Sequence, residues 1–188
     1  MSKRPIRVLQ LVAGVAIGDQ VGGAEYFGLQ LARHLDRREF EPAIFAMWRY
    51  NSPAEQQWLE TLHQEGLPVA GLVDVSRYPL FDLRPILLAL WAFTNAFKPD
   101  ILNSRSQRSD LLGALVHLLH PHHPRTVRTV HIDCPWLNRV YTDFVFDKIL
   151  FPLLFNIEIA VSETIRLKLD RRLLARLLKK ERCCLQWH

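Results

Sequence analysis

A regular alternation of short apolar segments with longer amphipathic ones constrains the fold of this chain most. Six segments are short, apolar and rich in β-branched or aromatic residues, which is the composition of buried strands. The segments expected to form strands are 7–12, 41–48, 68–73, 100–104, 125–131 and 157–161.

Each expected strand is followed by a segment with the apolar spacing of a helix. These segments are 24–35, 53–65, 82–97, 106–119, 138–155 with a break at Pro152, and a last one from Ser162 to about residue 180. Pro53 suits a first turn, and Asp82 and Ser162 suit cap positions. Strict alternation predicts right-handed crossovers and a parallel sheet. The predicted fold class is therefore α/β: a doubly wound, mainly parallel, Rossmann-like sheet of about six strands in a three-layer α/β/α arrangement.

Length and composition indicate one globular domain in a reducing compartment. The chain has 188 residues, of which 49% are hydrophobic and 23% charged, and these values exclude a mainly disordered chain. Three cysteines are an odd number and too few for a disulfide scaffold. The longest strongly apolar run, 85–97, is shorter than the roughly 20 residues that a membrane span needs. We therefore predict a cytoplasmic protein, with one domain over residues 1–169 and a basic helical tail, expected to be a truncated linker region, over 170–188.

The net charge of +5 is concentrated at the C-terminal end of the sequence. Residues 1–162 contain 16 Lys or Arg and 16 Asp or Glu, whereas residues 163–188 contain 8 and 3. The neutral body lacks the basic face of a nucleic-acid-binding domain, so we expect no nucleic-acid partner. We interpret the basic end as a solvated helix face. The alternative is that it contacts the inner face of an anionic membrane peripherally.

Glycines gather in the loop after the first expected strand. Gly14, Gly18, Gly22 and Gly23 lie between this strand and the next helix, and the last two directly precede the helix. A helix N-terminus presents unpaired N–H groups and a partial positive charge, so it attracts phosphate or carboxylate. Gly22 and Gly23 would let an anion approach without a Cβ in the way; the alternative is a turn whose glycines serve geometry only. Ligands of doubly wound sheets bind at the carboxyl ends of the strands, which makes this loop the first candidate for a site.

The spacing of motifs excludes the common nucleotide-binding and metal-binding patterns. The glycines do not match G-x-G-x-x-G, and Met47, Trp48 and Arg49 stand where a dinucleotide fold needs an acidic residue. A P-loop needs G-K-[ST], which the sequence lacks. The four histidines of HLLHPHH, at 117–123, have no cysteine or acid nearby to complete a zinc site. We therefore expect no metal and no cofactor.

Four segments in order carry a resemblance to a known family. The glycine loop ends in GGAE and leads directly into a helix, and the later segments are KPDILNSRS, RTVRTVHID and IEIAVSETIRLKL. They resemble the first, fourth, fifth and last strand regions in the N-terminal half of family 4 glycosyltransferases, which have the two-domain GT-B fold. The resemblance covers roughly residues 7–169. It implies transfer of a sugar from a nucleotide sugar, the co-substrate, to a saccharide, lipid or small-molecule acceptor.

The resemblance also implies roles for single residues. The glycine loop of the family lies near the donor diphosphate and the acceptor, and the matching residues are Gly22, Gly23 and Glu25. The family's histidine after the fifth strand faces the transferred sugar. His131 matches it, and would donate a hydrogen bond to a sugar hydroxyl or stabilise developing charge. The alternative for His131 is a buried histidine at a strand end that is bonded to backbone.

Two further residues are expected to bind substrate. Arg105 follows the fourth expected strand, where the family commonly has a histidine, and this departure leaves the acceptor contacts there open. Asp133 follows the fifth strand and is either a base or a loop cap.

The second domain of the family has no counterpart in these 188 residues. That domain binds the nucleotide sugar and carries two glutamates separated by seven residues, a pattern that is not found here. The last segment, KKERCCLQWH, stands where the linker and the next strand would begin. We therefore expect a missing or separate C-terminal donor domain and an incomplete enzyme, from a truncated or split product. The alternative is a catalytically silent Rossmann-like binding module or a subunit of a split protein.

Overall fold

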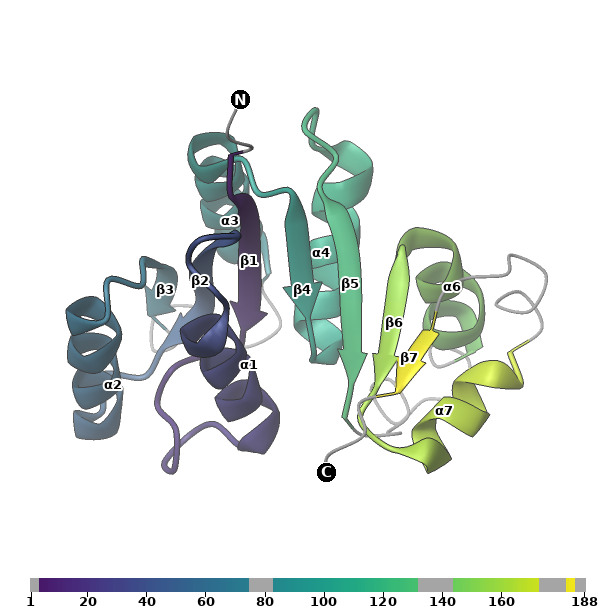
Figure 1. Ribbon diagram of the computed structural model, residues 1–188, viewed down its shortest axis with the longest axis horizontal. Coiled ribbons are helices and arrows are strands. Elements are labelled where there is room, and N and C mark those ends of the chain that lie inside the picture. Colours follow the sequence, from purple (N-terminus) through teal and green to yellow (C-terminus); the bar gives the residue numbers. More distant parts are fainter. Residues whose placement is uncertain (1–3, 75–82, 132–143, 173–181, 185–188) are drawn as a thin grey trace.

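Seven parallel strands form one sheet in the order β3-β2-β1-β4-β5-β6-β7 (Figure 1). The computed structural model describes residues 4–74, 83–131, 144–172 and 182–184. The strands are β1 (Ile6–Val12), β2 (Phe40–Arg49), β3 (Val69–Asp74), β4 (Ile101–Ser104), β5 (Arg125–Val130), β6 (Ile157–Ala160) and β7 (Arg182–Cys184). The predicted parallel, Rossmann-like sheet is confirmed, and β7 adds one strand to the expected six.

Helices cover both faces of the sheet, which gives the three layers of a doubly wound fold (Figure 1). Leu29 and Leu62 belong to the core that fills one face, the α1 face, together with Val12 and Ile44. Ile86 and Leu112 belong to the core of the other face, the α4 face. The helices are α1 (Gly23–His34), α2 (Pro53–Gln64), α3 (Arg84–Phe97), α4 (Gln107–Leu119), the π-helix η2 (Phe144–Leu150), α6 (Phe151–Leu154) and α7 (Glu163–Asp170).

Hydroxyl side chains begin the helices that follow β2, β4 and β6. Ser52 and Ser162 each accept a hydrogen bond from the backbone N–H three residues later. Ser106 begins α4 in a capping box with Ser109. Each of these bonds satisfies an N–H group that a helix leaves without an intrahelical partner. The expected cap Asp82 lies outside the described residues, and Leu83 precedes α3.

Two expectations for the second half of the chain need correction. The helix expected over 138–155 is, in its described part, the π-helix η2 followed by the short helix α6, with Pro152 in the first turn of α6. The last helix, expected to reach about residue 180, is α7 and ends at Asp170. Residues Arg182–Cys184, which lie within the expected helical tail, form the strand β7 and pair with β6. This pairing gives hydrogen-bond partners to backbone N–H and C=O groups of β6 that would otherwise be unpaired at the edge of the sheet.

The apolar helix α3 is only partly buried. Ile86, Leu90 and Thr94 face the sheet, whereas Leu88 is 72% exposed. Leu88 therefore belongs to the outer surface, although the composition of the segment predicts a helix that is mostly buried. Among the residues that the structure describes, no helix combines the length and the apolar character needed to cross a membrane.

The connections reverse direction between β1 and β4, which are neighbours in the sheet. From β1 the chain winds outward to β2 and β3, then returns to β4 and continues to β5 on the other side. Gln10 on β1 pairs in register with Asn103 on β4. In doubly wound folds the crevice at the carboxyl ends of these two strands is where ligands bind.

Candidate functional site

A group of polar and aromatic residues lies at the carboxyl ends of β1, β4 and β5 and against α1. We call it the carboxyl-end cluster, and it consists of Gln10, Glu25, Phe27, Gly28, Arg105 and His131. Its members come from β1, from α1 and from the first residues after β4 and β5. The cluster therefore lies at the place where the topology predicts a ligand site.

Arg105 is the charged centre of the cluster. Its side chain is 5% exposed, and Nη2 donates a hydrogen bond to Oε1 of Gln10. Its backbone N–H donates to Oγ of Ser109 over 3.2 Å, which fixes the start of α4 beside it. Burial lowers the pKa of Arg105 to about 10, with the charges of Glu25 and Asp110 acting in the opposite direction. The guanidinium therefore remains a cation at neutral pH.

Gly28 provides the space that Arg105 occupies. A Cβ at this position would lie 1.1 Å from Nη1 of Arg105, so any larger residue would overlap the guanidinium. A glycine inside a helix costs about 1 kcal/mol relative to alanine. Gly28 is thus a position where close packing of α1 against Arg105 takes precedence over helix propensity.

His131 is held by aromatic packing. Its ring meets that of Phe27 edge to face, with the centroids 5.3 Å apart. Arg105 lies over the same Phe27 ring, with Cζ 6.0 Å from the centroid. Burial lowers the pKa of His131, and the charge of Arg105 lowers it further. The imidazole is therefore neutral at neutral pH, with one nitrogen that donates and one that accepts.

Glu25 is a buried acid on the first turn of α1. It is 6% exposed, and burial raises its pKa, while the charge of Arg105 and a backbone hydrogen bond from Ala13 act in the opposite direction. That bond joins the first turn of α1 to the end of β1.

Gly22 and Gly23 form the open start of α1. A Cβ at either position would meet no heavy atom within 4 Å, and no side chain caps the helix at Gly22. The first N–H groups of a helix lack intrahelical partners, so this end of α1 can accept an anion. The anion-binding role expected for Gly22 and Gly23 remains a prediction.

The expected site residues are only partly brought together. Glu25, Arg105 and His131 share the carboxyl-end cluster, and Gly22 and Gly23 begin the helix that carries Glu25. Asp133 lies outside the described residues. Trp48, which the sequence places near a strand end, is buried in the core within β2.

Three members of the cluster were not anticipated. Gln10 is a polar residue in the buried, otherwise apolar part of β1, residues 8–12, and Gly28 lies inside an amphipathic helix, so both positions could be noticed in the sequence. Phe27 could not be recognised from the sequence, because an aromatic residue in such a helix usually belongs to the core.

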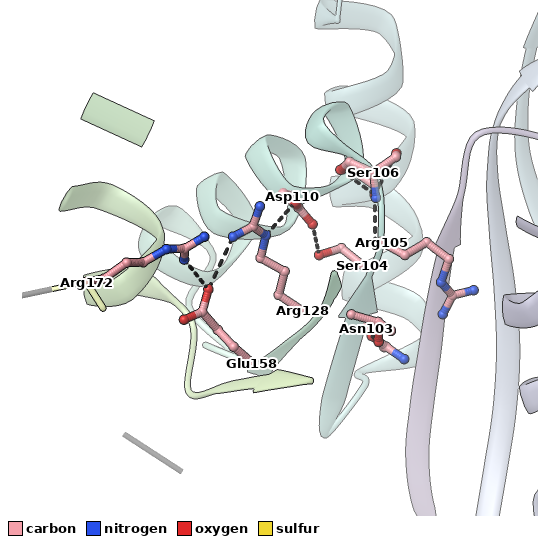
Figure 2. Close-up of polar contacts among 10 residues, drawn as sticks. Asn103, Ser104, Arg105, Ser106, Asp110, Arg128, Glu158 and Arg172 are labelled. Atoms are coloured by element: carbon pink, nitrogen blue, oxygen red, sulfur yellow. Dashed lines mark hydrogen bonds and ion pairs between the residues drawn. The ribbon is translucent and has the colours of Figure 1, made fainter. Parts of the chain in front are cut away.

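A second polar network lies on the α4 face of the sheet (Figure 2). It runs from Ser104 through Asp110, Arg128 and Glu158 to Arg172, by hydrogen bonds of 2.6, 2.7, 3.2 and 2.9 Å. Figure 2 shows the side chain of Arg105 pointing away from this network, towards β1. The Arg105 guanidinium therefore takes no part in the hydrogen bonds of this network, although Ser104 and Arg105 are adjacent in the chain, and Asp110 acts on it only through its charge.

The histidines of HLLHPHH hold the end of α4 in place. Each of them has a ring nitrogen within hydrogen-bond distance of a backbone or side-chain group, and His120 also packs edge to face on Trp91. Within the described ranges, no group of three or more His, Cys, Asp or Glu side chains could hold a metal ion.

The fold is a Rossmann-like domain, and the cluster lies at the carboxyl ends of its strands. The model of the family described as Glycosyltransferase Family 4 matches residues 21–180, and the chain belongs to this family. No curated protein matches the chain.

Solved structures of GT-B glycosyltransferases have the same fold over one part of their length. Anabaena HepE in complex with UDP-glucose is 17% identical, with a TM-score of 0.65 over 94% of this chain and 43% of HepE. A glycosyltransferase from Rickettsia africae is 15% identical, with a TM-score of 0.66 over 98% and 43%. Sucrose-phosphate synthase from Thermosynechococcus elongatus is 14% identical, with a TM-score of 0.66 over 96% and 47%. The chain thus spans less than half the length of these structures.

Proposed function

We propose that this chain is the N-terminal, acceptor-side domain of a glycosyltransferase that uses a nucleotide sugar. The observation that carries the proposal is the carboxyl-end cluster, in a chain that belongs to Glycosyltransferase Family 4. The acceptor is a saccharide, a lipid or a small molecule. The donor-binding half lies outside these 188 residues, in keeping with the 43% of HepE that the chain covers.

His131 is the residue that contacts the transferred sugar in this proposal. Its Nε2 is buried and has no hydrogen-bond partner, so it is available to a ligand. A neutral imidazole either donates a hydrogen bond to a sugar hydroxyl or accepts one, according to its tautomer. Contact at this point orients the sugar and adds polar stabilisation as charge develops.

The start of α1 is the proposed place for a phosphate. Gly22 and Gly23 leave its backbone N–H groups open, and the helix dipole favours negative charge there. Glu25 lies on the same turn and is tied to Ala13, which keeps the glycine loop close to β1. Arg105 and Asp133 complete the proposed substrate-binding residues. No metal is part of the proposal.

Binding of saccharides to the purified chain tests this function. In an NMR titration of the labelled chain with a panel of sugars and sugar phosphates, the sugars should shift the signals of His131 and the phosphates those of Gly22–Gly23. His131→Ala should weaken that binding, whereas Arg4→Ala, at the amino end of the sheet, should leave it unchanged. Binding that does not involve these positions would contradict the proposal.

Two further observations separate an enzyme half from a silent binding module. The purified chain alone should not turn over nucleotide sugars, because the donor half is needed, and robust turnover would contradict this part of the proposal. An open reading frame downstream that encodes a domain with two glutamates separated by seven residues would support the enzyme. Its absence would favour the silent module.

A further inference from the structure

The carboxyl-end cluster buries more polar atoms than it can pair. Gln10 Nε2, Glu25 Oε2, Arg105 Nε, Arg105 Nη1 and His131 Nε2 are all buried without a hydrogen-bond partner. Buried polar groups in folded proteins are nearly always bonded, and each exception calls for an explanation. In the described part of the chain, the other such atoms belong to Trp48, Thr94 and Glu158, which are outside the cluster. Five orphaned atoms in one cluster indicate a place for a bound molecule.

Hydrogen-bond donors predominate among these atoms. The amide nitrogen of Gln10 and the two nitrogens of Arg105 can only donate, whereas Oε2 of Glu25 is the one oxygen. His131 Nε2 serves as donor or acceptor according to its tautomer. A molecule that satisfies this set needs an oxygen-rich group that accepts several hydrogen bonds.

The cluster contains one cation, one acid and one histidine. Arg105 is the cation, and His131 is neutral because burial and Arg105 lower its pKa. The charges of Glu25 and Asp110 act on Arg105, but Asp110 is hydrogen-bonded to Ser104 and Arg128 on the α4 face. The N–H groups at Nε and Nη1 of Arg105 have no hydrogen-bond partner and are left for a ligand.

The geometry points to an acid group on the acceptor: Arg105 binds the carboxylate or phosphate of an acidic sugar and selects it against neutral sugars. This inference rests on the proposed function and names the class of acceptor. A guanidinium offers a planar set of N–H donors that suits both oxyanions. Gln10 Nε2 adds a donor beside it.

The position of Arg105 separates this acid group from the proposed donor phosphate. The guanidinium lies against Gly28, five residues further along α1 than Gly23. At about 1.5 Å per residue, the two anion positions are about 7.5 Å apart along the helix.

NMR titration of the 188-residue chain with four probes tests the inference. The probes are D-glucuronate, D-glucose 6-phosphate, D-glucose and UDP at equal concentration and ionic strength. The first two should shift the signals of Gly28, His131 and the Arg105 side chain, and glucose should bind at least about tenfold more weakly. Comparing the two acids tells carboxylate from phosphate. Comparing them with UDP tells an acceptor acid from a donor diphosphate.

Three variants and a control locate the binding at Arg105. Arg105→Gln should abolish the preference for acids, and Arg105→Lys should keep part of it because the charge remains. Gly28→Ala should weaken acid binding, since it displaces the guanidinium without removing it. Arg125→Gln changes an exposed arginine at the amino end of β5 and should have no effect. Circular dichroism and urea unfolding establish that each variant is folded, and the comparison of acids with glucose on the unmodified chain needs no variant.

Three results would overturn the inference: glucose binding as tightly as the acids, no binding of either acid, or Arg105-dependent binding of UDP alone. The titration measures binding without sugar transfer, so its failure can be told apart from failure of the proposed function. Acid binding without transfer by the complete enzyme would refute only the function. Transfer to neutral acceptors without acid binding would refute only this inference.

Discussion

Arg128 donates a hydrogen bond from Nε to Oδ2 of Asp110 over 2.7 Å, and the two side chains are only 8% and 4% exposed. The other carboxylate oxygen of Asp110 accepts from the hydroxyl of Ser104 over 2.6 Å. Arg128 also lies over the ring of Phe151, with Cζ 4.4 Å from the centroid. Removing one member of such a buried ion pair lowers the stability of the fold strongly, because the remaining charge stays buried without its partner.

Removing the acid of this pair should destabilise the domain strongly. Asp110→Ala leaves Arg128 without its nearest carboxylate, and the free energy of unfolding should fall by about 3–5 kcal/mol. Urea denaturation measures the change. The exposed ion pair of Asp36 with Arg38 provides the control, since Asp36→Ala should leave the free energy of unfolding almost unchanged. Equal losses in the two variants would show that the buried pair adds nothing.

Gly28 and Arg105 should be coupled energetically. Gly28→Ala favours the helix by about 1 kcal/mol. However, its Cβ would lie 1.1 Å from Nη1 of Arg105, and overpacking of this kind costs about 1–3 kcal/mol. We therefore expect a net loss of stability in the native background and a gain in an Arg105→Ala background. A double-mutant cycle by urea unfolding measures the coupling, and simple additivity of the two changes would contradict the close contact.

His131 should titrate below the usual range of a histidine. Burial and the charge of Arg105 lower its pKa, so Arg105→Gln should raise it, while Arg125→Gln should not. The unfolded chain binds a proton near pH 6.5, before the folded state does. The contribution of His131 to stability is therefore present above about pH 6.5 and is lost as the pH falls towards the folded pKa. NMR titration of the ring protons measures the pKa, and a value unchanged by Arg105→Gln would contradict the expected influence of Arg105.

The strands β1 to β6 could be predicted from local pattern because each is a short segment rich in apolar or β-branched residues. The strand β1 is the expected segment 7–12 with Ile6 added, and β5 is the expected segment 125–131 without its last residue. The strand β7 could not be predicted in this way. It has three residues, and its pairing with β6 depends on a neighbour more than 20 residues away in the chain.

The candidate site was harder to predict because its contacts join distant segments. Arg105 bonds Gln10, which lies 95 residues earlier in the chain, and no local pattern predicts that contact. Arg128 and Glu158 stand inside short strands, where a single sequence gives no sign that they pair across β5 and β6. The places of Gly22 and Gly23 at a helix start follow from local pattern, whereas the expected role of His131 came from the resemblance to the family.

Arg172 should tie the end of α7 to the sheet. Its Nη1 donates to Oε1 of Glu158 over 2.9 Å, and both side chains are buried. Arg172→Met removes a hydrogen bond to a buried charge, so the free energy of unfolding should fall by about 1.5–3 kcal/mol. The neighbouring Arg171 is exposed, and Arg171→Met should change the free energy of unfolding by no more than about 0.5 kcal/mol. Amide hydrogen exchange should also become faster in α7 and β6 of the Arg172 variant alone, because that bond joins the two elements. Equal exchange in both variants would mean that packing of Ile165 and Leu169 holds α7 in place without the ion pair.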